Sequence, residues 1–188
     1  MSSDVRSILA RHDPARWKRT LSYRPKAELP YDLLRLPSDA PLLFDATVYI
    51  DLLKGDLPTP IVTLVASRVI LHGAPALAEL AVVVGVLNPQ DARTTDTLKP
   101  ILETLERISP ARIVVPSHDV WLEASLLAGI LARTQGIPKT DRCKFLSDAL
   151  LFLIAAESQS VLISRNSRDI DLLLQMKPGV RVLLYEQA

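Results

Sequence analysis

Four acidic residues in this sequence stand beside or within apolar segments. Asp45 and Asp169 each follow a short apolar run, whereas Glu79 and Asp148 are each the only charged residue of a long apolar segment. Crowded carboxylates repel one another unless a cation neutralises them, and ligand sets made of oxygen alone suit Mg²⁺ or Mn²⁺. Such a site activates water and stabilises the charge of an in-line attack on phosphorus. The four acids predict this chemistry if the fold brings them together.

Two of these acids also have a structural interpretation as helix caps. Asp45 lies where an apolar run changes to helical periodicity, and Asp is a common residue at the first position of a helix. In the same way, Ser147 or Asp148 can cap the helix expected over residues 145–156. A cap accounts for each acid without any chemistry, so both interpretations stay open at this stage.

Glu79 needs a partner if its helix is buried. Residues 74–87 are apolar on every side of a helix apart from this one carboxylate, and a helix that is apolar all round is expected to be buried. A buried carboxylate without a partner is costly. A metal ion would be one such partner, and Arg165 or Arg168 would be a structural alternative.

Apolar runs alternate with segments of helical periodicity through most of the chain. We expect strands at 42–44, 67–72, 113–116, 161–164 and 180–185, and helices at 48–54, 74–87, 98–108, 120–134, 145–156 and 170–176. Residues 61–66 fit either a helix or a strand. Strands that alternate with helices indicate an α/β domain with a parallel sheet and helices on both faces, and in such domains ligands bind at the carboxyl ends of the strands.

Residues 1–40 differ in composition from the remainder. They contain eight Lys or Arg against five Asp or Glu, together with four prolines. Helical spacing of apolar residues predicts a short helix before Pro14. We interpret 1–40 as a basic N-terminal extension and 41–188 as one domain. The extension either contacts RNA or a partner protein, or packs Trp17 against the domain; packing is the favoured interpretation.

The overall composition is that of a globular protein. The chain has 188 residues, is 48% hydrophobic and carries a net charge of +1, so it has no global basic field that would announce a nucleic acid. One cysteine, Cys143, excludes an internal disulfide and a cysteine-based zinc site, and we expect it to be partly buried. No apolar run reaches membrane-spanning length, and the expected location is cytoplasmic. His118 beside Asp119 could form an acid/base pair, but we favour a structural interpretation for it and for the two other histidines.

Four short motifs resemble those of the PIN-domain nucleases, and within that family the VapC-type toxins of bacterial toxin-antitoxin modules. Phe44 to Asp51 resembles the opening motif, and Ala78-Glu79-Leu80 the second. Ser147 to Leu150, followed by Ser164 to Ile170, resembles the third and fourth motifs in their usual relation. The resemblance covers roughly residues 42–185. It implies a three-layer α/β/α PIN-like domain with a central, mainly parallel sheet of four to five strands.

The resemblance also implies an activity and a set of site residues. It implies a ribonuclease that depends on Mg²⁺ or Mn²⁺ and acts as the toxin of a plasmid-stability module, with RNA as substrate, a small antitoxin as a possible partner, and a homodimer. Asp45, Glu79 and Asp148 would bind the metal, and Asn166 and Asp169 would complete the site. Residues implied to contact the substrate or support the acids are Thr47, Ser164, Arg165 and Arg168.

The chain departs from the family pattern around these acids. Ala46 and Thr47 stand where the family has a hydroxyl residue and then Asn, and Gly73 and Ala76 stand where small hydroxyl residues often precede the second acid. Thr47 can still hydrogen-bond to a carboxylate, whereas Ala46 cannot. The long segment between the second and third acids adds two rival acids, Asp119 and Asp141.

Two other classes of function stay open. One is a non-catalytic PIN-like protein that binds RNA or regulates a partner, which the altered residues around the acids favour. The other is a phosphotransferase of the haloacid-dehalogenase kind, which uses an Asp after a strand as its nucleophile. That class needs a second Asp two residues later, and position 47 is Thr.

Overall fold

The structure is a computed structural model that describes residues 5–88 and 90–187; residues 1–4 of the predicted extension and residues 89 and 188 of the predicted domain lie outside the described residues. Within the described ranges, five strands form one parallel sheet in the order β3-β2-β1-β4-β5. The strands are β1 (Leu42–Phe44), β2 (Ile70–Gly73), β3 (Ile113–Val114), β4 (Val161–Ser164) and β5 (Val182–Leu184). The predicted α/β fold is confirmed, with the last strand at one edge.

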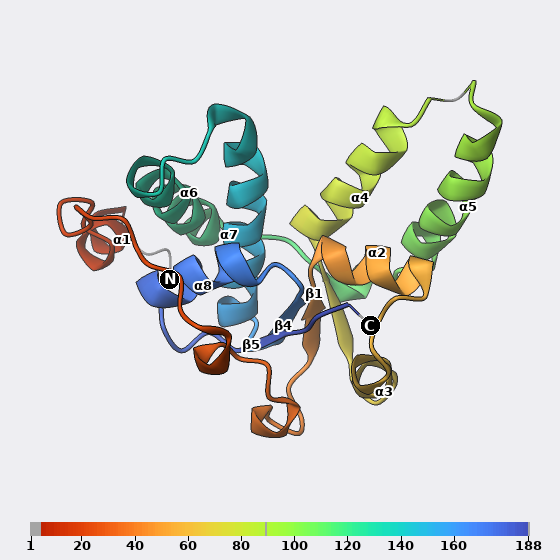
Figure 1. Cartoon of the computed structure of the whole chain (residues 1–188), viewed down its shortest axis with the longest axis horizontal. Helices are drawn as coiled ribbons and strands as arrows, with labels where there is room; N and C mark the ends of the chain where they lie inside the picture. Colours follow the sequence, from red (N-terminus) through yellow and green to blue (C-terminus); the bar gives the residue numbers. More distant parts are fainter. Residues whose placement is uncertain (1–4, 89, 188) are drawn as a thin grey trace.

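Helices lie on both faces of this sheet (Figure 1). They are α1 (Val5–Arg11), α2 (Ala46–Lys54), α3 (Thr59–Ala66), α4 (Ala74–Val86), α5 (Ala92–Arg107), α6 (His118–Thr134), α7 (Arg142–Glu157) and α8 (Ser167–Met176). Short 3₁₀ turns occur at Lys26–Glu28, Leu33–Arg35, Pro110–Arg112 and Lys139–Asp141. The ambiguous segment 61–66 is therefore helical.

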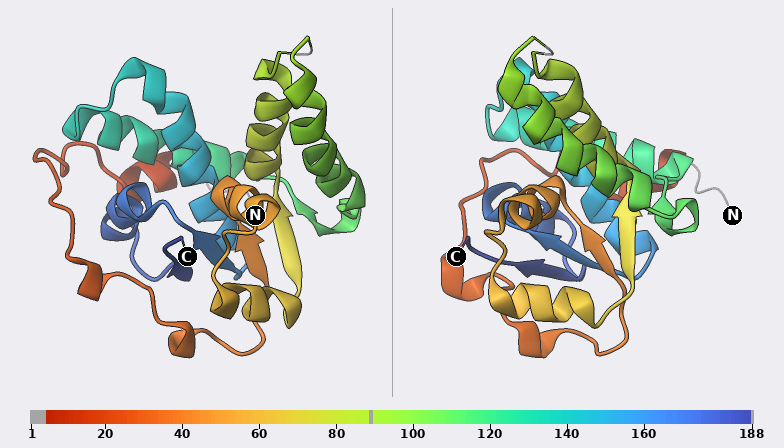
Figure 2. Two further views of the ribbon diagram at one scale, coloured as in Figure 1. Left: turned by 45° about the vertical axis from the view of Figure 1, so that its right-hand side comes forward. Right: turned by 90° about the vertical axis from the view of Figure 1, so that its right-hand side faces the viewer.

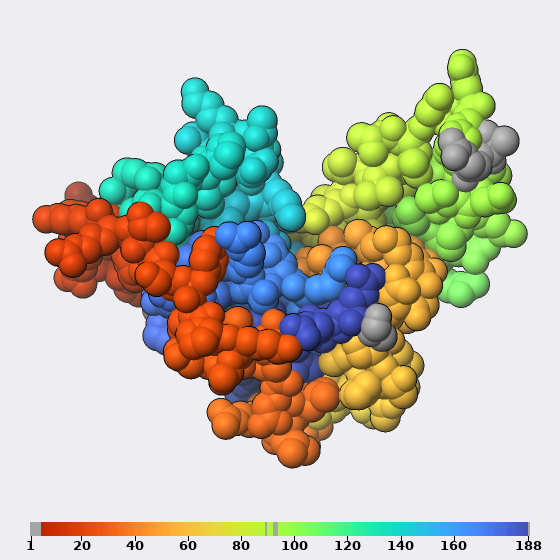
Figure 3. Space-filling model, viewed as in Figure 1, coloured from red at the N-terminus to blue at the C-terminus, as the bar shows by residue number. Residues whose placement is uncertain are grey.

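Two pairs of helices rise from the sheet and enclose a hollow. Helices α4 and α5 form one pair, and α6 and α7 form the other (Figures 1 and 2). The space-filling view shows the hollow between the two pairs (Figure 3). Helix α2, which begins just after β1, lies at the foot of the α4–α5 pair. The four predicted acids belong to the segments that converge on this region.

Helix α7 is the centre of the core. It contacts β4, α4, α6 and α8, and its residues 148–155 are all buried. Gly73, at the end of β2, lies so close to α7 that a Cβ atom there would collide with the side chain of Leu151. A hydroxyl residue at position 73 would therefore require the side chain of Leu151 to shift.

The prediction that α4 is buried is wrong for its second half. Its buried residues are Pro75, Ala76 and Leu80, whereas Val82 and Val86 are 62% and 75% exposed. The physical reason is the position of the helix: the end of α4 projects with α5 away from the sheet (Figure 2). A uniformly apolar sequence fails to distinguish a helix in the core from one whose apolar surface is open.

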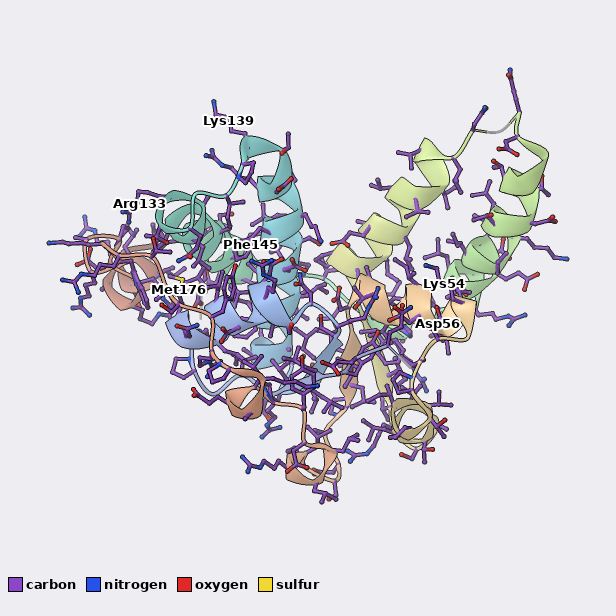
Figure 4. All side chains as sticks on the ribbon, viewed as in Figure 1. Lys54, Asp56, Arg133, Lys139, Phe145 and Met176 are labelled. Carbon is purple, nitrogen blue, oxygen red and sulfur yellow. The ribbon has the colours of Figure 1, made fainter. Side chains whose placement is uncertain are left out.

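The N-terminal extension packs along α6 and α8. Ile8 of the predicted short helix is 2% exposed, and α1 contacts α6. Arg133, near the end of α6 (Figure 4), donates hydrogen bonds of 3.0 Å to the backbone oxygens of Pro14 and Trp17. Trp17 packs against the core, in line with the favoured interpretation.

Two surface features complete the description. Cys143 is exposed, so the prediction of partial burial is wrong; the reason is that α7 begins at Arg142 and places this residue in its first, solvent-facing turn. In the part of the chain that the structure describes, no helix combines the length and the apolar character needed to cross a bilayer.

Candidate metal centre and active site

Asp45 is fixed by two hydroxyl groups at the carboxyl end of β1. Its Oδ2 accepts hydrogen bonds from Ser164 Oγ at 2.5 Å and from Thr47 Oγ1 at 2.9 Å. Thr47 Oγ1 in turn accepts a hydrogen bond from the backbone N–H of Arg165. Because β1 and β4 are adjacent and parallel, the residues that follow them meet at one edge of the sheet.

Asn166 joins the other two acids of this edge. Its Nδ2 donates to Asp148 Oδ2 at 3.0 Å and to Asp169 Oδ2 at 2.8 Å. Its backbone N–H donates to Ser164 Oγ at 3.0 Å, which links it to the hydroxyl that holds Asp45. The side chain of Asn166 also caps α8 through the backbone N–H of Asp169. One short loop therefore orients three carboxylates.

The acids act on one another electrostatically. Asp148 is 4% exposed, and burial raises its pKa well above the usual value. Nearby negative charges, which belong to Asp45, Asp169 and Glu79, raise it further. The Lys144 ammonium, one helical turn before Asp148, opposes this rise. The dominant surroundings of Asp148 therefore favour its neutral form unless a cation enters.

Glu79 has the same imbalance. Burial raises its pKa, the Ser147 side chain opposes the rise by hydrogen bonding, and the charge of Asp45 adds to it. One carboxylate oxygen, Oε1, is buried without a hydrogen-bond partner. Glu79 also lines an apolar pocket of about 370 Å³ between α2, α4 and α7. An unsatisfied buried carboxylate oxygen is costly, and a positively charged ligand would satisfy it.

The donor set fits a hard divalent cation. The group offers carboxylate oxygens, ligands that Mg²⁺ and Mn²⁺ prefer. Within the described ranges, however, no three His, Cys, Asp or Glu side chains lie close enough to form a ready-made metal cluster. Two of the acids are instead held by Asn166. The assignment of Asp45, Glu79 and Asp148 as metal ligands stays a prediction that the charges of the site support.

The structure decides between several interpretations of single residues. Asp45 occupies the cap position of α2 but makes no side-chain capping hydrogen bond. The cap interpretation of Ser147 and Asp148 is wrong, since α7 begins earlier, at Arg142, and both residues lie in its second turn.

Arg165 and Arg168 make different contacts from those that the sequence suggested. Arg165 forms an ion pair with the buried Asp51 at 3.1 Å, and the Arg168 guanidinium lies over the ring of Tyr23. Neither is the partner of Glu79 that the sequence suggested. Asp171, on the same helix as Arg168, pairs with Arg24 from the N-terminal extension. Sequence position alone did not reveal these partners because they are distant in the chain.

The rival acids and the histidines have structural surroundings. Neither Asp119 nor Asp141 is among the acids that raise the pKa of Asp148. Ser117 caps α6 through the backbone N–H of Val120, and the exposed His118 lies beside Asp119. The two other histidines each bond to one side chain: His12 to Glu123 and His72 to Tyr49.

Sequence reasoning missed Lys144 and Tyr23 as residues next to the acids. Lys144 precedes Asp148 by four residues, and helical spacing identifies such a neighbour once the start of α7 is known. Tyr23 lies in the extension, and its place beside Arg168 on α8 follows from tertiary packing alone. No local pattern around Tyr23 could have indicated this.

Comparison of the sequence with models of known protein families gives no match, and no protein of curated function matches it. Solved structures do match. FitAcB from Neisseria gonorrhoeae aligns with a TM-score of 0.52 and 18% identity over 76% of this chain and 96% of that chain. The chain has the fold of that protein. The resemblance to VapC-type proteins is thereby confirmed at the level of fold.

Two further structures give the same result. VapBC-1 from nontypeable Haemophilus influenzae aligns with a TM-score of 0.53 and 18% identity, covering 77% of this chain and 97% of that chain. VapBC2 from Rickettsia felis, bound to a DNA fragment from its promoter, aligns with a TM-score of 0.52 and 12% identity, covering 78% and 99%. The three-layer PIN-like architecture is therefore shared, while the identities are too low to carry function across.

Proposed function

We propose that this protein is a metal-dependent ribonuclease that hydrolyses RNA phosphodiester bonds. The observation that carries the proposal is the group of acids at the edge of the sheet, in which Asp45, Glu79 and Asp148 face one another's charges. Burial raises the pKa of Glu79 and of Asp148, and repulsion from the neighbouring acids raises both further. Natural sequences do not usually maintain such repulsion without a functional reason, and perturbed carboxylates of this kind cluster at functional sites.

We assign Asp45, Glu79 and Asp148 as the residues that hold Mg²⁺ or Mn²⁺. A divalent cation supplies this site with a way to lower the pKa of water and to neutralise charge on the phosphate. Ser164 and Thr47 orient Asp45 through their hydroxyl groups, and Asn166 orients Asp148 and Asp169. Thr47 therefore supplies a hydroxyl contact to Asp45 although Ala46 cannot.

The two arginines receive different roles. Arg165 is tied to Asp51 and to Gln187, so we assign it to positioning the loop that carries Asn166. Arg168 lies at the start of α8 beside Asp169 and contacts the exposed Tyr23, which leaves it near the substrate side. We propose that Arg168 contacts the RNA.

We also propose that the protein is the toxin of a toxin-antitoxin module and has a protein partner. The solved structures that share its fold are named as two-component complexes, VapBC and FitAcB. The exposed apolar surface at the end of α4, with Val82 and Val86, is a second observation in favour of a partner, since contiguous apolar surface commonly marks an interface. A small antitoxin or a second copy of the chain would cover it.

An RNA cleavage assay tests the proposed activity. The purified protein should cleave single-stranded RNA with Mg²⁺ or Mn²⁺ present and stop when a chelator is added. Asp148→Asn should reduce the rate by at least about 100-fold, because the loss of a ligand exceeds the usual cost of losing a residue that merely supports one. Asp119→Asn, which removes the rival acid, is the control and should leave the rate unchanged.

Two results would count against this proposal. Cleavage that persists in the chelator, or that Asp148→Asn leaves intact, would exclude the proposed metal centre. RNA binding by the wild-type protein without any cleavage in either metal would favour the non-catalytic alternative.

A further inference from the structure

A second cavity lies next to the acids and is completed by the N-terminal extension. It has a volume of about 490 Å³ and lies between the extension, the turn from α6 to α7, and α8. We call it the extension pocket; the side chains that matter here are Tyr23, Lys144, Phe145, Arg168, Asp141 and Asp169. Asp169 belongs both to this pocket and to the acid group, so the two sites are contiguous. Phe145 lies on α7 (Figure 4).

Tyr23 is held in this pocket by its neighbours in the chain. The backbone N–H of Arg24 donates to Asp171 Oδ2 at 2.8 Å, and its side chain forms an ion pair with the same carboxylate at 2.6 Å. On the other side, Ser22 accepts a hydrogen bond from Gln175 at 3.0 Å. The residues before and after Tyr23 are thus both bound to α8, which fixes the position of this half-exposed side chain.

The ring of Tyr23 is a stacking surface. Tyr23 is 47% exposed, and the Arg168 guanidinium lies 4.8 Å from its ring centroid. Arg168 and an aromatic ring in this arrangement both offer flat faces on which an unpaired base stacks. Tyrosine rings that serve only to anchor a segment are usually buried, whereas this one faces the cavity.

The charges of the pocket favour a base over a phosphate group. Lys144 and Arg168 supply two positive charges, and Asp141 and Asp169 supply two negative ones. The balance gives a free anion little net attraction. The binding of an uncharged base does not depend on a net positive charge. A base can stack on the flat surface, while the polar groups around it hydrogen-bond to its edges.

We propose that Tyr23 and Arg168 form a stacking platform for one base of a single-stranded RNA, next to the nucleotide whose phosphodiester lies at the acids. The proposal rests on the proposed ribonuclease function and adds a substrate contact supplied by the extension. Tyr23 contributes the ring and Arg168 holds and extends its surface. The extension is then part of the substrate site rather than only a packed segment.

Binding of RNA without metal tests this platform. A fluorescein-labelled single-stranded RNA of eight nucleotides is titrated in chelator and followed by anisotropy, so that cleavage plays no part. Tyr23→Ala should weaken binding at least about fivefold, the lower range of one lost stacking contact. Tyr23→Phe should bind within about twofold of wild type, because it keeps the ring.

Tyr31→Ala is a matched control. Tyr31 is also a tyrosine of the extension, and Lys26 lies 5.2 Å from its ring centroid, but it lines a different pocket. This variant should bind single-stranded RNA as wild type does. A double-stranded RNA of the same length should bind equally to wild type and Tyr23→Ala, because its bases are already stacked.

Equal affinity of wild type and Tyr23→Ala for single-stranded RNA would overturn the proposal. It would also be overturned if Tyr23→Ala and Tyr31→Ala lost the same amount of affinity, or if wild type showed no measurable binding. Thermal unfolding of each variant checks that it is folded, and Tyr23→Phe restores the ring with least risk to the fold. Failure of the proposed ribonuclease would appear separately, as the absence of metal-dependent cleavage, since the affinities are compared without metal.

Discussion

Two regions of this molecule that contain buried carboxylates differ in the charge of the neighbouring side chains. The neighbours are positively charged in one region and mainly negatively charged in the other. Under the N-terminal extension, Glu123 bonds to His12 at 2.7 Å and to Lys177 at 2.6 Å. Burial alone would raise the pKa of Glu123, but these hydrogen bonds lower it to about 2. Asp171, in the same region, is paired with Arg24. These acids attach the extension to the domain.

At the edge of the sheet the charged neighbours of the acids are mainly other acids. Asp148 and Glu79 have raised pKa values because burial and nearby carboxylates both disfavour their charge. The buried Asp51, close in sequence to Asp45, instead pairs with Arg165 and Tyr185. Burial of an acid is therefore no sign of function by itself; the sign of the surrounding charge separates an acid that is paired in the fold from one whose charge its neighbours disfavour.

The largest difference should appear when one acid of each region loses its charge. Glu123→Gln should lower the free energy of unfolding by about 2–3 kcal/mol, because it leaves His12 and Lys177 without their anion. Glu79→Gln should leave the free energy of unfolding unchanged or raise it, because it removes repulsion. Urea unfolding of both variants without metal measures this contrast. Equal losses of unfolding free energy in the two variants would contradict the difference between the two regions.

The pH dependence of stability should separate the two regions in sign. The lowered pKa of Glu123 means that its contribution is present above its ordinary pKa of 4.5 and is lost as the pH falls towards 2. The raised pKa of Asp148 means the reverse: the folded state holds its proton more tightly, so metal-free stability falls as the pH rises above 3.8, the ordinary pKa of Asp.

Two variants isolate these contributions. Wild type should exceed Glu123→Gln in stability by an amount that grows as the pH rises from 2 to 4.5. Asp148→Asn should become more stable than wild type as the pH rises through the range where Asp148 ionises. Thermal unfolding over a pH series gives both differences, and curves that run parallel to wild type would refute the assigned charges.

The smallest effect on stability is expected at the exposed apolar surface of α4. Replacing Val82 and Val86 with Asp should change the free energy of unfolding of the monomer by less than about 0.5 kcal/mol per site, because both side chains are already in solvent. If this surface is an interface, the same change should remove a dimer or an antitoxin complex. Light scattering after size-exclusion chromatography reports the assembly, and an unchanged mass would place the interface elsewhere.

Much of the fold was predictable because local patterns carried it. The buried strands around Leu42 and Leu162 are continuous apolar runs, and Gly55 ends α2 in the left-handed conformation that glycine adopts readily. Such features depend on a few adjacent residues. They could be read without knowing what packs against them.

Other features depended on distant residues and could not be predicted. Val82 was expected in the core because an apolar sequence does not tell which helix the sheet covers. The start of α7 was placed too late because polar residues such as Lys144 belong to its exposed first turn. The pairing of Arg165 with Asp51 joins segments far apart in the chain, and no local pattern predicts it.

The sequence proposed the acids of the candidate site, but the hydrogen bonds that connect them could not be predicted from it. The motifs identified Asp45 and Asp148, and the structure adds that Ser164 and Asn166 connect them through hydrogen bonds. Thr47 was expected to support Asp45, and the structure gives it that contact. Whether these acids bind a metal ion is a question of affinity, which spacing alone leaves open.

Calorimetric titration of the metal-free protein with Mn²⁺ tests this question most directly. Wild type should bind with a saturable isotherm and release more protons on binding as the pH is lowered, since a cation must displace any proton held by the carboxylates of raised pKa. Asp148→Asn should bind at least about 10-fold more weakly, and Glu123→Gln should bind as wild type does. No binding by wild type, or equal binding by Asp148→Asn, would contradict a metal centre at the edge of the sheet.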